Sequence, residues 1–113
     1  MATPATANIR VMRGDTEIII VTVTGDDGVT PINITGRSYS AQIRYERNSP
    51  TIAATFACTV SNGAAGQVTL TLSAIDSATL TDGAAFWDLQ ENNAGIITTV
   101  VAGKCTILAD VTR

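Results

Sequence analysis

Histidine is absent from this sequence, and that absence removes the base on which most nucleophilic catalysis depends. An activated Ser or Cys needs a neighbouring base, usually His, so the common catalytic triads are excluded. Ten acidic residues leave a pair of carboxylates as the remaining option, but nothing in their positions marks such a pair. We therefore expect no enzyme, no catalytic residue and no cofactor.

Cysteine is also scarce, because Cys58 and Cys105 are the only two in the chain. They lie far apart in the sequence and form no CxxC spacing, which leaves zinc without a ligand set. Asp26-Asp27-Gly28 supplies two carboxylates but no further acid downstream that could complete a calcium site, so it reads as a hairpin turn. We predict no metal site and two reduced thiols that point inward.

Charge of positive sign and long apolar runs are limited as well. Seven basic residues are scattered against ten acidic ones, for a net charge of -3, which argues against nucleic-acid binding. The longest apolar run covers residues 18–23 and is interrupted by Thr22, far short of the ~20 residues that span a bilayer. The first 15 residues contain no apolar signal segment, so we expect neither membrane insertion nor export.

The 113 residues, 45% hydrophobic, instead carry short segments with the alternation of β-strands. Strands are expected at residues 17–24, 40–46, 52–60, 67–72, 85–91, 96–101 and 103–109, with an edge piece at 29–34. Turn residues such as Asn92-Asn93-Ala94-Gly95 separate them. Residues 52–60 and 67–72 predict one hairpin, and residues 85–91 and 96–101 predict a second.

One segment breaks the strand pattern. At residues 73–80 the period changes, and Ser73 with Asp76 three residues later predicts a capped helical turn. About seven strands with one short crossover helix are typical of an all-β, immunoglobulin-like β-sandwich. Residues 1–9, rich in Ala and Thr, predict a flexible N-terminal arm, and residues 10–113 predict a single domain.

The first long strand has a feature that points to a partner. If Ile19, Val21 and Val23 face the core, Ile18 and Ile20 must point to the other side of the sheet. Two exposed isoleucines on a domain with 15% charged residues favour association, so Ile18 and Ile20 form a candidate protein–protein interface. The alternative is a strand that is buried on both faces within its own domain.

Several segments together resemble a recurrent bacteriophage domain, the immunoglobulin-like amino-terminal domain of upper baseplate and tail-fibre proteins. The resemblance covers about residues 10–113. The matching segments are Arg13-Gly14-Asp15, residues 31–36, Ala41-Gln42-Ile43-Arg44, residues 66–73, Trp87-Asp88-Leu89 and residues 110–113.

The resemblance implies a β-sandwich that docks onto a tail or baseplate core and assembles as a symmetric homo-oligomer. Its expected partners are other virion proteins, namely tail, baseplate or capsid subunits. It implies a virion protein that is assembled in the bacterial cytoplasm, whose reducing conditions agree with unpaired thiols. A capsid decoration protein is an alternative within the same class. A host-surface glycan-binding module is an alternative of another class, although the aromatic residues are few and Trp87 is expected in the core.

Overall fold

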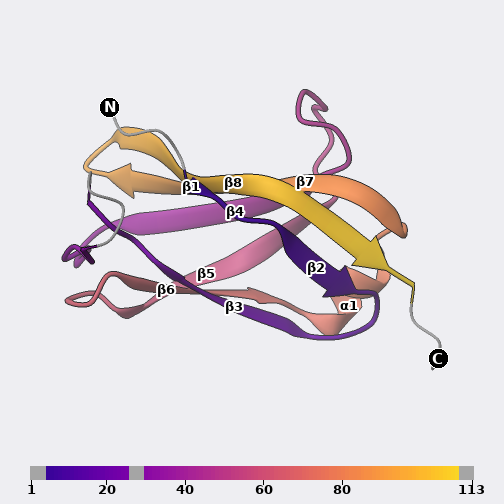
Figure 1. Ribbon diagram of the computed structural model, residues 1–113, viewed down its shortest axis with the longest axis horizontal. Coiled ribbons are helices and arrows are strands. Elements are labelled where there is room, and N and C mark those ends of the chain that lie inside the picture. The colour runs from indigo at the N-terminus through magenta and orange to yellow at the C-terminus, as the bar shows by residue number, and fades with distance from the viewer. Residues whose placement is uncertain (1–4, 26–29, 110–113) are drawn as a thin grey trace.

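The computed structural model describes residues 5–25 and 30–109, which fold into a two-layered β-sandwich (Figure 1). The strands are β1 Ala5–Thr6, β2 Ile9–Met12, β3 Glu17–Thr22, β4 Ser38–Arg44, β5 Ala54–Asn62, β6 Gln67–Leu72, β7 Gly83–Asn93 and β8 Ile96–Leu108. The helix α1, Ala74–Ala78, lies between β6 and β7. No helix among these residues is long and apolar enough to cross a membrane.

The strand order is β1-β8-β7-β4-β5-β6-β3, with β2 also paired to β8. β5 belongs to both layers, because its residues Ala54 to Phe56 pair with β4 and its residues from Ala57 onward pair with β6. One layer is therefore β3-β6-β5 and the other is β4-β7-β8 with β1 and β2 at its edge. These sets correspond to the two sheets of an immunoglobulin-like sandwich. The predicted fold class is confirmed.

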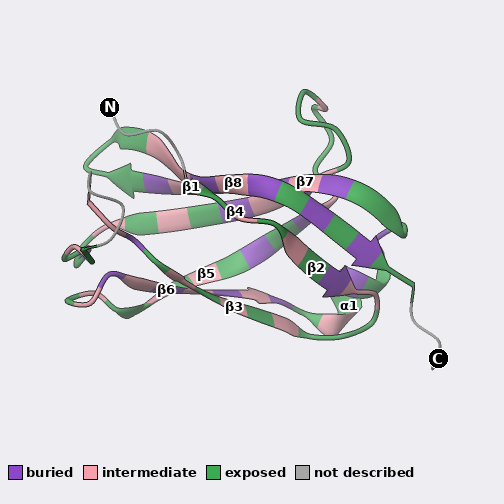
Figure 2. Ribbon diagram, in the orientation of Figure 1, coloured by how far each residue is buried: buried purple, intermediate pink, exposed green. Residues whose placement is uncertain are grey.

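The core lies between the two layers, where alternate residues of each strand point inward (Figure 2). β6 shows the alternation most clearly, since Val68, Leu70 and Leu72 are fully buried and the threonines between them are not. The buried residues from the other strands are Val11, Ala41, Ile43, Ala54, Phe56, Ala85, Trp87, Leu89, Val101, Cys105 and Ile107.

Both predicted hairpins are present, and so is the predicted cap of α1. β5 pairs with β6 and β7 pairs with β8 in antiparallel register. The Ser73 hydroxyl accepts a hydrogen bond from the Asp76 backbone N–H at 3.1 Å, as a helix N-cap does. The predicted hairpin turn at Asp26-Asp27-Gly28 lies outside the described residues.

The N-terminal segment differs from the prediction of a flexible arm over residues 1–9. From Ala5 onward it is paired in parallel with β8, first through β1 and then through β2. The sequence of this segment does not predict the pairing, because strands of two and four residues are too short to show an alternation of apolar and polar residues. Regular structure thus begins before the expected domain boundary at residue 10.

Three further strand predictions need correction. The two strands expected at residues 96–101 and 103–109 are one long strand, β8, which stays paired to β7 across a register shift beside Leu89. β5 begins at Ala54 and not at residue 52. Alternation over the strand expected at residues 40–46 predicts that Tyr45 faces the core together with Ala41 and Ile43. Tyr45 instead lies just beyond the end of β4 and is 40% exposed, and its hydroxyl accepts a hydrogen bond from the Thr81 N–H.

Candidate docking surface on the edge strand

β3 lies at the end of the sheet order, where it pairs with β6 along one side only. Among residues 5–25 and 30–109, no strand pairs with its other side. An edge of this kind presents backbone N–H and C=O groups to whatever approaches it. The strand is β-branched from Ile18 to Val21, so it has the composition of a central strand in an edge position.

The predicted parity of β3 is confirmed. Ile18 and Ile20 are 64% and 63% exposed, whereas Ile19 and Val21 pack against the core and Val23 is buried. The alternative of a strand covered on both faces within the domain is therefore wrong. Whether a partner covers these two side chains stays a prediction.

The outer face around Ile18 and Ile20 carries no charged side chain. In the β3–β6 register Ile18 lies opposite Thr71 and Ile20 opposite Thr69, and the same two threonines lie opposite Ala57 and Thr59 of β5. Glu17 at the start of β3 is the strand's only charge, and its carboxylate accepts a hydrogen bond from the Met12 N–H. We call the outward-facing residues of this surface the β3 face: the exposed Ile18, Ile20, Thr22, Ala57 and Thr59, and the partly exposed Thr69 and Thr71.

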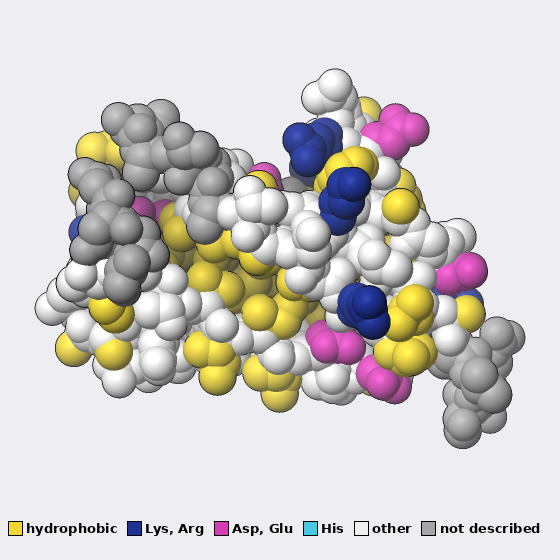
Figure 3. All heavy atoms as spheres, viewed as in Figure 1, with side chains coloured by type: hydrophobic (Ala, Val, Ile, Leu, Met, Phe, Trp, Pro, Cys, Tyr) yellow, Lys and Arg dark blue, Asp and Glu magenta, His cyan; other side chains and the backbone are white. Residues whose placement is uncertain are grey.

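Apolar character continues from the β3 face around the edge of the sandwich. Figure 3 shows hydrophobic side chains gathered in the seam between the two layers, between β3 and the strands β1 and β2. Ile9 of β2 and Ile19 of β3 are only partly buried and pack against the core from the two sides. Edge strands that remain solvated normally carry Lys, Pro or bulges, and β3 has none of these.

The two cysteines lie on different strands and are free. Cys105 on β8 is buried, and burial raises the pKa of its thiol to about 11, with a further rise from the charge of Glu17. Cys58 on β5 is partly buried, and burial raises its pKa as well, against a hydrogen bond from the Ala41 backbone that lowers it. Both thiols are thus disfavoured as nucleophiles and as metal ligands.

Trp87 is a core residue, as the sequence predicts. Its side chain is 4% exposed and meets the Phe56 ring edge-on, with the ring centroids 6.4 Å apart. Its indole N–H donates a 2.8 Å hydrogen bond to the carbonyl oxygen of Ala7 in the N-terminal segment. Trp87 therefore offers no free ring face to a ligand.

A polar cluster closes one end of the sandwich. The Glu91 carboxylate is buried and accepts hydrogen bonds from the Arg37 guanidinium at 2.8 Å and from the Tyr39 hydroxyl at 2.7 Å. Burial and the nearby carboxylate raise the pKa of Tyr39 far above its usual range. The side chains satisfy one another, so this cluster is structural.

A second surface lies on the layer of β4, β7 and β8, and the sequence did not predict it. The outer faces of β4, β7 and β8 surround a hollow of about 300 Å³. Its walls include Arg44, Arg47, Phe86 and Asp88, which come from two segments about 40 residues apart in the sequence. The outward parity of residues 42 and 44, and of 86, 88 and 90, was the available signal. Only the β4–β7 register brings these residues together.

Comparisons with known proteins bear on the fold. No family model matches the chain, and no curated protein sequence does. Among solved structures, the N-terminal domain of ORF48 from phage TP901-1 matches with a TM-score of 0.54 at 11% identity, covering 96% of this chain and 91% of that one.

Two other solved structures are more distant. InlP of Listeria monocytogenes gives a TM-score of 0.47 at 12% identity, over 96% of this chain and 28% of that one. An extracellular fragment of novel immune-type receptor 11 from Ictalurus punctatus gives 0.36 at 13% identity, over 100% and 90%. The predicted resemblance to a phage domain is confirmed at the level of the fold, which this chain shares over nearly its whole length with the TP901-1 domain.

Proposed function

We propose that this protein is a non-catalytic structural module of a phage virion, which docks onto tail or baseplate subunits through the β3 face. The observation that carries the proposal is an unprotected, β-branched edge strand beside an uncharged outer face. The fold shared with a domain of phage TP901-1 supports a phage setting. Assembly in the bacterial cytoplasm fits the two free thiols.

The geometry of β3 suggests how the partner is held. An incoming strand can pair with the free backbone groups of β3, while its side chains cover Ile18 and Ile20. Fully burying an isoleucine contributes roughly 1.5 to 3 kcal/mol. Since about two thirds of each side chain is still exposed, coverage would contribute roughly 1 to 2 kcal/mol per residue. Together the two isoleucines can therefore change the affinity for a partner substantially.

The double variant Ile18→Thr/Ile20→Thr tests the proposal. Threonine keeps the β-branching, so the fold should survive while association weakens. A matched control is Ile96→Thr/Ile97→Thr, which alters a similarly exposed pair, 68% and 55%, at the start of β8. The molar mass measured by light scattering and the amount of protein incorporated into phage particles should both fall for the β3 variant. Both should stay unchanged for the control.

Two outcomes contradict the proposal. Unchanged mass and incorporation in the β3 variant would rule out this face, and absence of the protein from purified virions would rule out the virion role. Location and copy number in intact particles, by cryo-EM and quantitative mass spectrometry, separate a tail or baseplate protein, present in a few rings, from a capsid decoration protein, present in hundreds of copies.

A further inference from the structure

The hollow on the outer face of β4, β7 and β8 is open to solvent and has a volume of about 300 Å³, the lower end of the range for small-ligand sites. We call it the outer groove. It exists because β8 contributes small residues there: Ala102 lies in register with Asp88, and Gly103 in register with Trp87. On the other side the long side chains of β4 and of the loop after it rise above the sheet.

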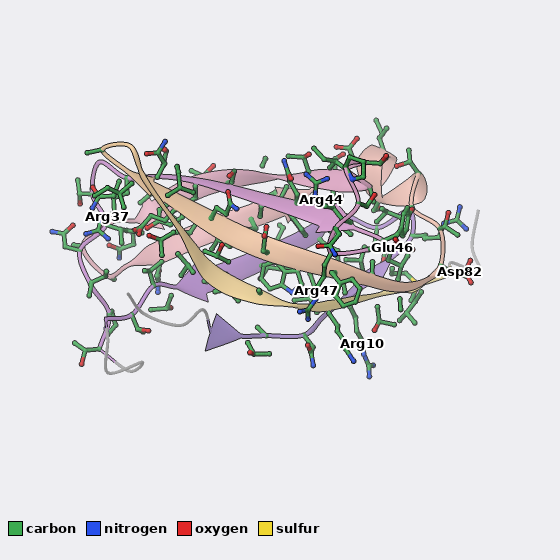
Figure 4. The ribbon with its side chains drawn as sticks, turned by 90° about the horizontal axis from the view of Figure 1, so that it is seen from above. Arg10, Arg37, Arg44, Glu46, Arg47 and Asp82 are labelled. Atoms are coloured by element: carbon green, nitrogen blue, oxygen red, sulfur yellow. The ribbon has the colours of Figure 1, made fainter. Side chains whose placement is uncertain are left out.

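Two guanidinium groups are held in place beside this groove. Arg44 donates one hydrogen bond to the Ser49 carbonyl at 2.6 Å and another to the Gln42 side-chain oxygen at 3.0 Å. Arg47 lies over the Phe86 ring, 4.8 Å from its centroid. Figure 4, which looks down on this layer, shows both arginines on the same part of the sheet, whereas Arg37 lies at its far end. Each guanidinium has five N–H donors, so most of them remain free.

Asp88 supplies the opposite kind of group. It is partly buried on β7, and within the described part of the chain its carboxylate makes no hydrogen bond or ion pair. Burial raises the pKa of Asp88, against the lowering effect of the Arg44 charge. A carboxylate in this position costs stability, and its acceptor oxygens have no hydrogen-bond partner among residues 5–25 and 30–109.

The remaining wall residues are amides and a hydroxyl. The Gln42 side-chain oxygen is occupied by Arg44, which leaves its NH₂ group to donate, while Gln90 and Ser40 can donate and accept. The outer groove therefore places donors and acceptors side by side over a small area. It lies on the opposite layer from the β3 face, so its chemistry does not depend on the proposed docking function.

The mixture of charges restricts the ligand. A cation would meet two arginines, and an anion would meet the unpaired carboxylate of Asp88. A saccharide has neighbouring hydroxyl groups, each of which can donate to a carboxylate and accept from a guanidinium or an amide. We propose that the outer groove binds a neutral saccharide, with Asp88 accepting from its hydroxyl groups and Arg44 and Gln42 donating to them.

An NMR titration of the whole protein with four neutral sugars, glucose, galactose, N-acetylglucosamine and N-acetylgalactosamine, tests this proposal. At least one should shift the backbone amides of residues 40–44, 86–90 and 102–103 in a saturable manner. Asp88→Ala should weaken that binding by at least about tenfold, the effect expected for losing hydrogen bonds to a charged group. Asp82→Ala, which removes an exposed acid outside the groove, is the control and should bind normally.

Asp88→Asn guards against a folding defect in the alanine variant, because it keeps the side-chain shape and removes the unfavourable charge of a partly buried group. It should fold and bind more weakly than the wild type. The proposal is overturned if none of the four sugars shifts these amides, if only acidic sugars or inorganic phosphate do so, or if the two Asp88 variants bind as well as the wild type.

Discussion

Gly103→Ala is expected to detach the N-terminal segment from β8 without unfolding the sandwich. A Cβ atom at this position would overlap the Ala7 carbonyl oxygen and lie 2.7 Å from the Ala7 carbonyl carbon. The backbone at Ala7 approaches β8 this closely only because Gly103 has no side chain. The methyl group must therefore push the segment away, since the obstacle is backbone and cannot rotate aside.

The magnitude follows from the hydrogen bonds that depend on this approach. They are Ala7 N–H to the Ala102 carbonyl at 3.1 Å, the Trp87 indole N–H to the Ala7 carbonyl at 2.8 Å, and Lys104 N–H to the Asn8 side chain at 3.1 Å. At a net contribution of about 1 kcal/mol each, losing all three lowers the free energy of unfolding by about 3 kcal/mol. A domain of this size should then melt roughly 10 °C lower but remain folded at room temperature.

Two measurements check this prediction. Thermal unfolding gives the stability, and amide hydrogen exchange at Ala7 reports the local detachment, which should be fast in the variant while β4 and β7 stay protected. Trp87 is the only tryptophan, so its emission should shift to the red when the Ala7 carbonyl leaves it. Gly25→Ala is the control, since within the described part of the chain its Cβ would meet only the Ile32 side chain, at 3.4 Å. A variant that melts like the wild type and keeps Ala7 protected would refute the reasoning.

Three further predictions rest on burial of ionisable groups. The Cys105 thiol should react slowly with thiol reagents in the native protein, whereas unfolding without reductant should release two free thiols. If the unfolded protein showed no free thiols, Cys58 and Cys105 would be joined in a disulfide, which would contradict the structure. Because the unfolded chain loses the Cys105 proton near pH 9 and the folded one near pH 11, stability should fall as the pH rises between these values, as measured by urea unfolding. Asp88→Asn should raise the stability at neutral pH, since the native pKa of Asp88 is raised, and this gain should shrink as the pH is lowered and the wild-type carboxylate becomes protonated. A destabilised Asn variant at pH 7 would show that the charge of Asp88 stabilises the fold.

The sequence predicted those parts of the fold that repeat a local pattern. Alternation placed Ile18 and Ile20 outside and Val68 and Leu70 inside, because a strand with one buried face must alternate. The cap at Ser73 and both hairpin turns were readable for the same reason, since each is fixed by residues within a few positions of one another.

What the sequence did not predict depends on contacts between distant segments. β1 and β2 are strands because β8 offers them a parallel edge and Gly103 lets Ala7 approach, and neither condition can be read from residues 5–12. Tyr45 continues the alternation of apolar and polar residues in the sequence of β4, but the strand ends at Arg44. The outer groove required the pairing of β4 with β7, which is not encoded in either strand alone.

The two outer faces of the sandwich differ in chemistry, and this difference allows them to act separately. The β3 face has no charged side chain, whereas the outer groove on the other layer combines Arg44, Arg47 and Asp88. An uncharged face can be buried without desolvating ions, which makes it suited to a permanent contact. A groove of charged and amide groups keeps its water until a polar ligand replaces it. Because the faces point away from each other, a partner seated on β3 leaves the outer groove open to solvent.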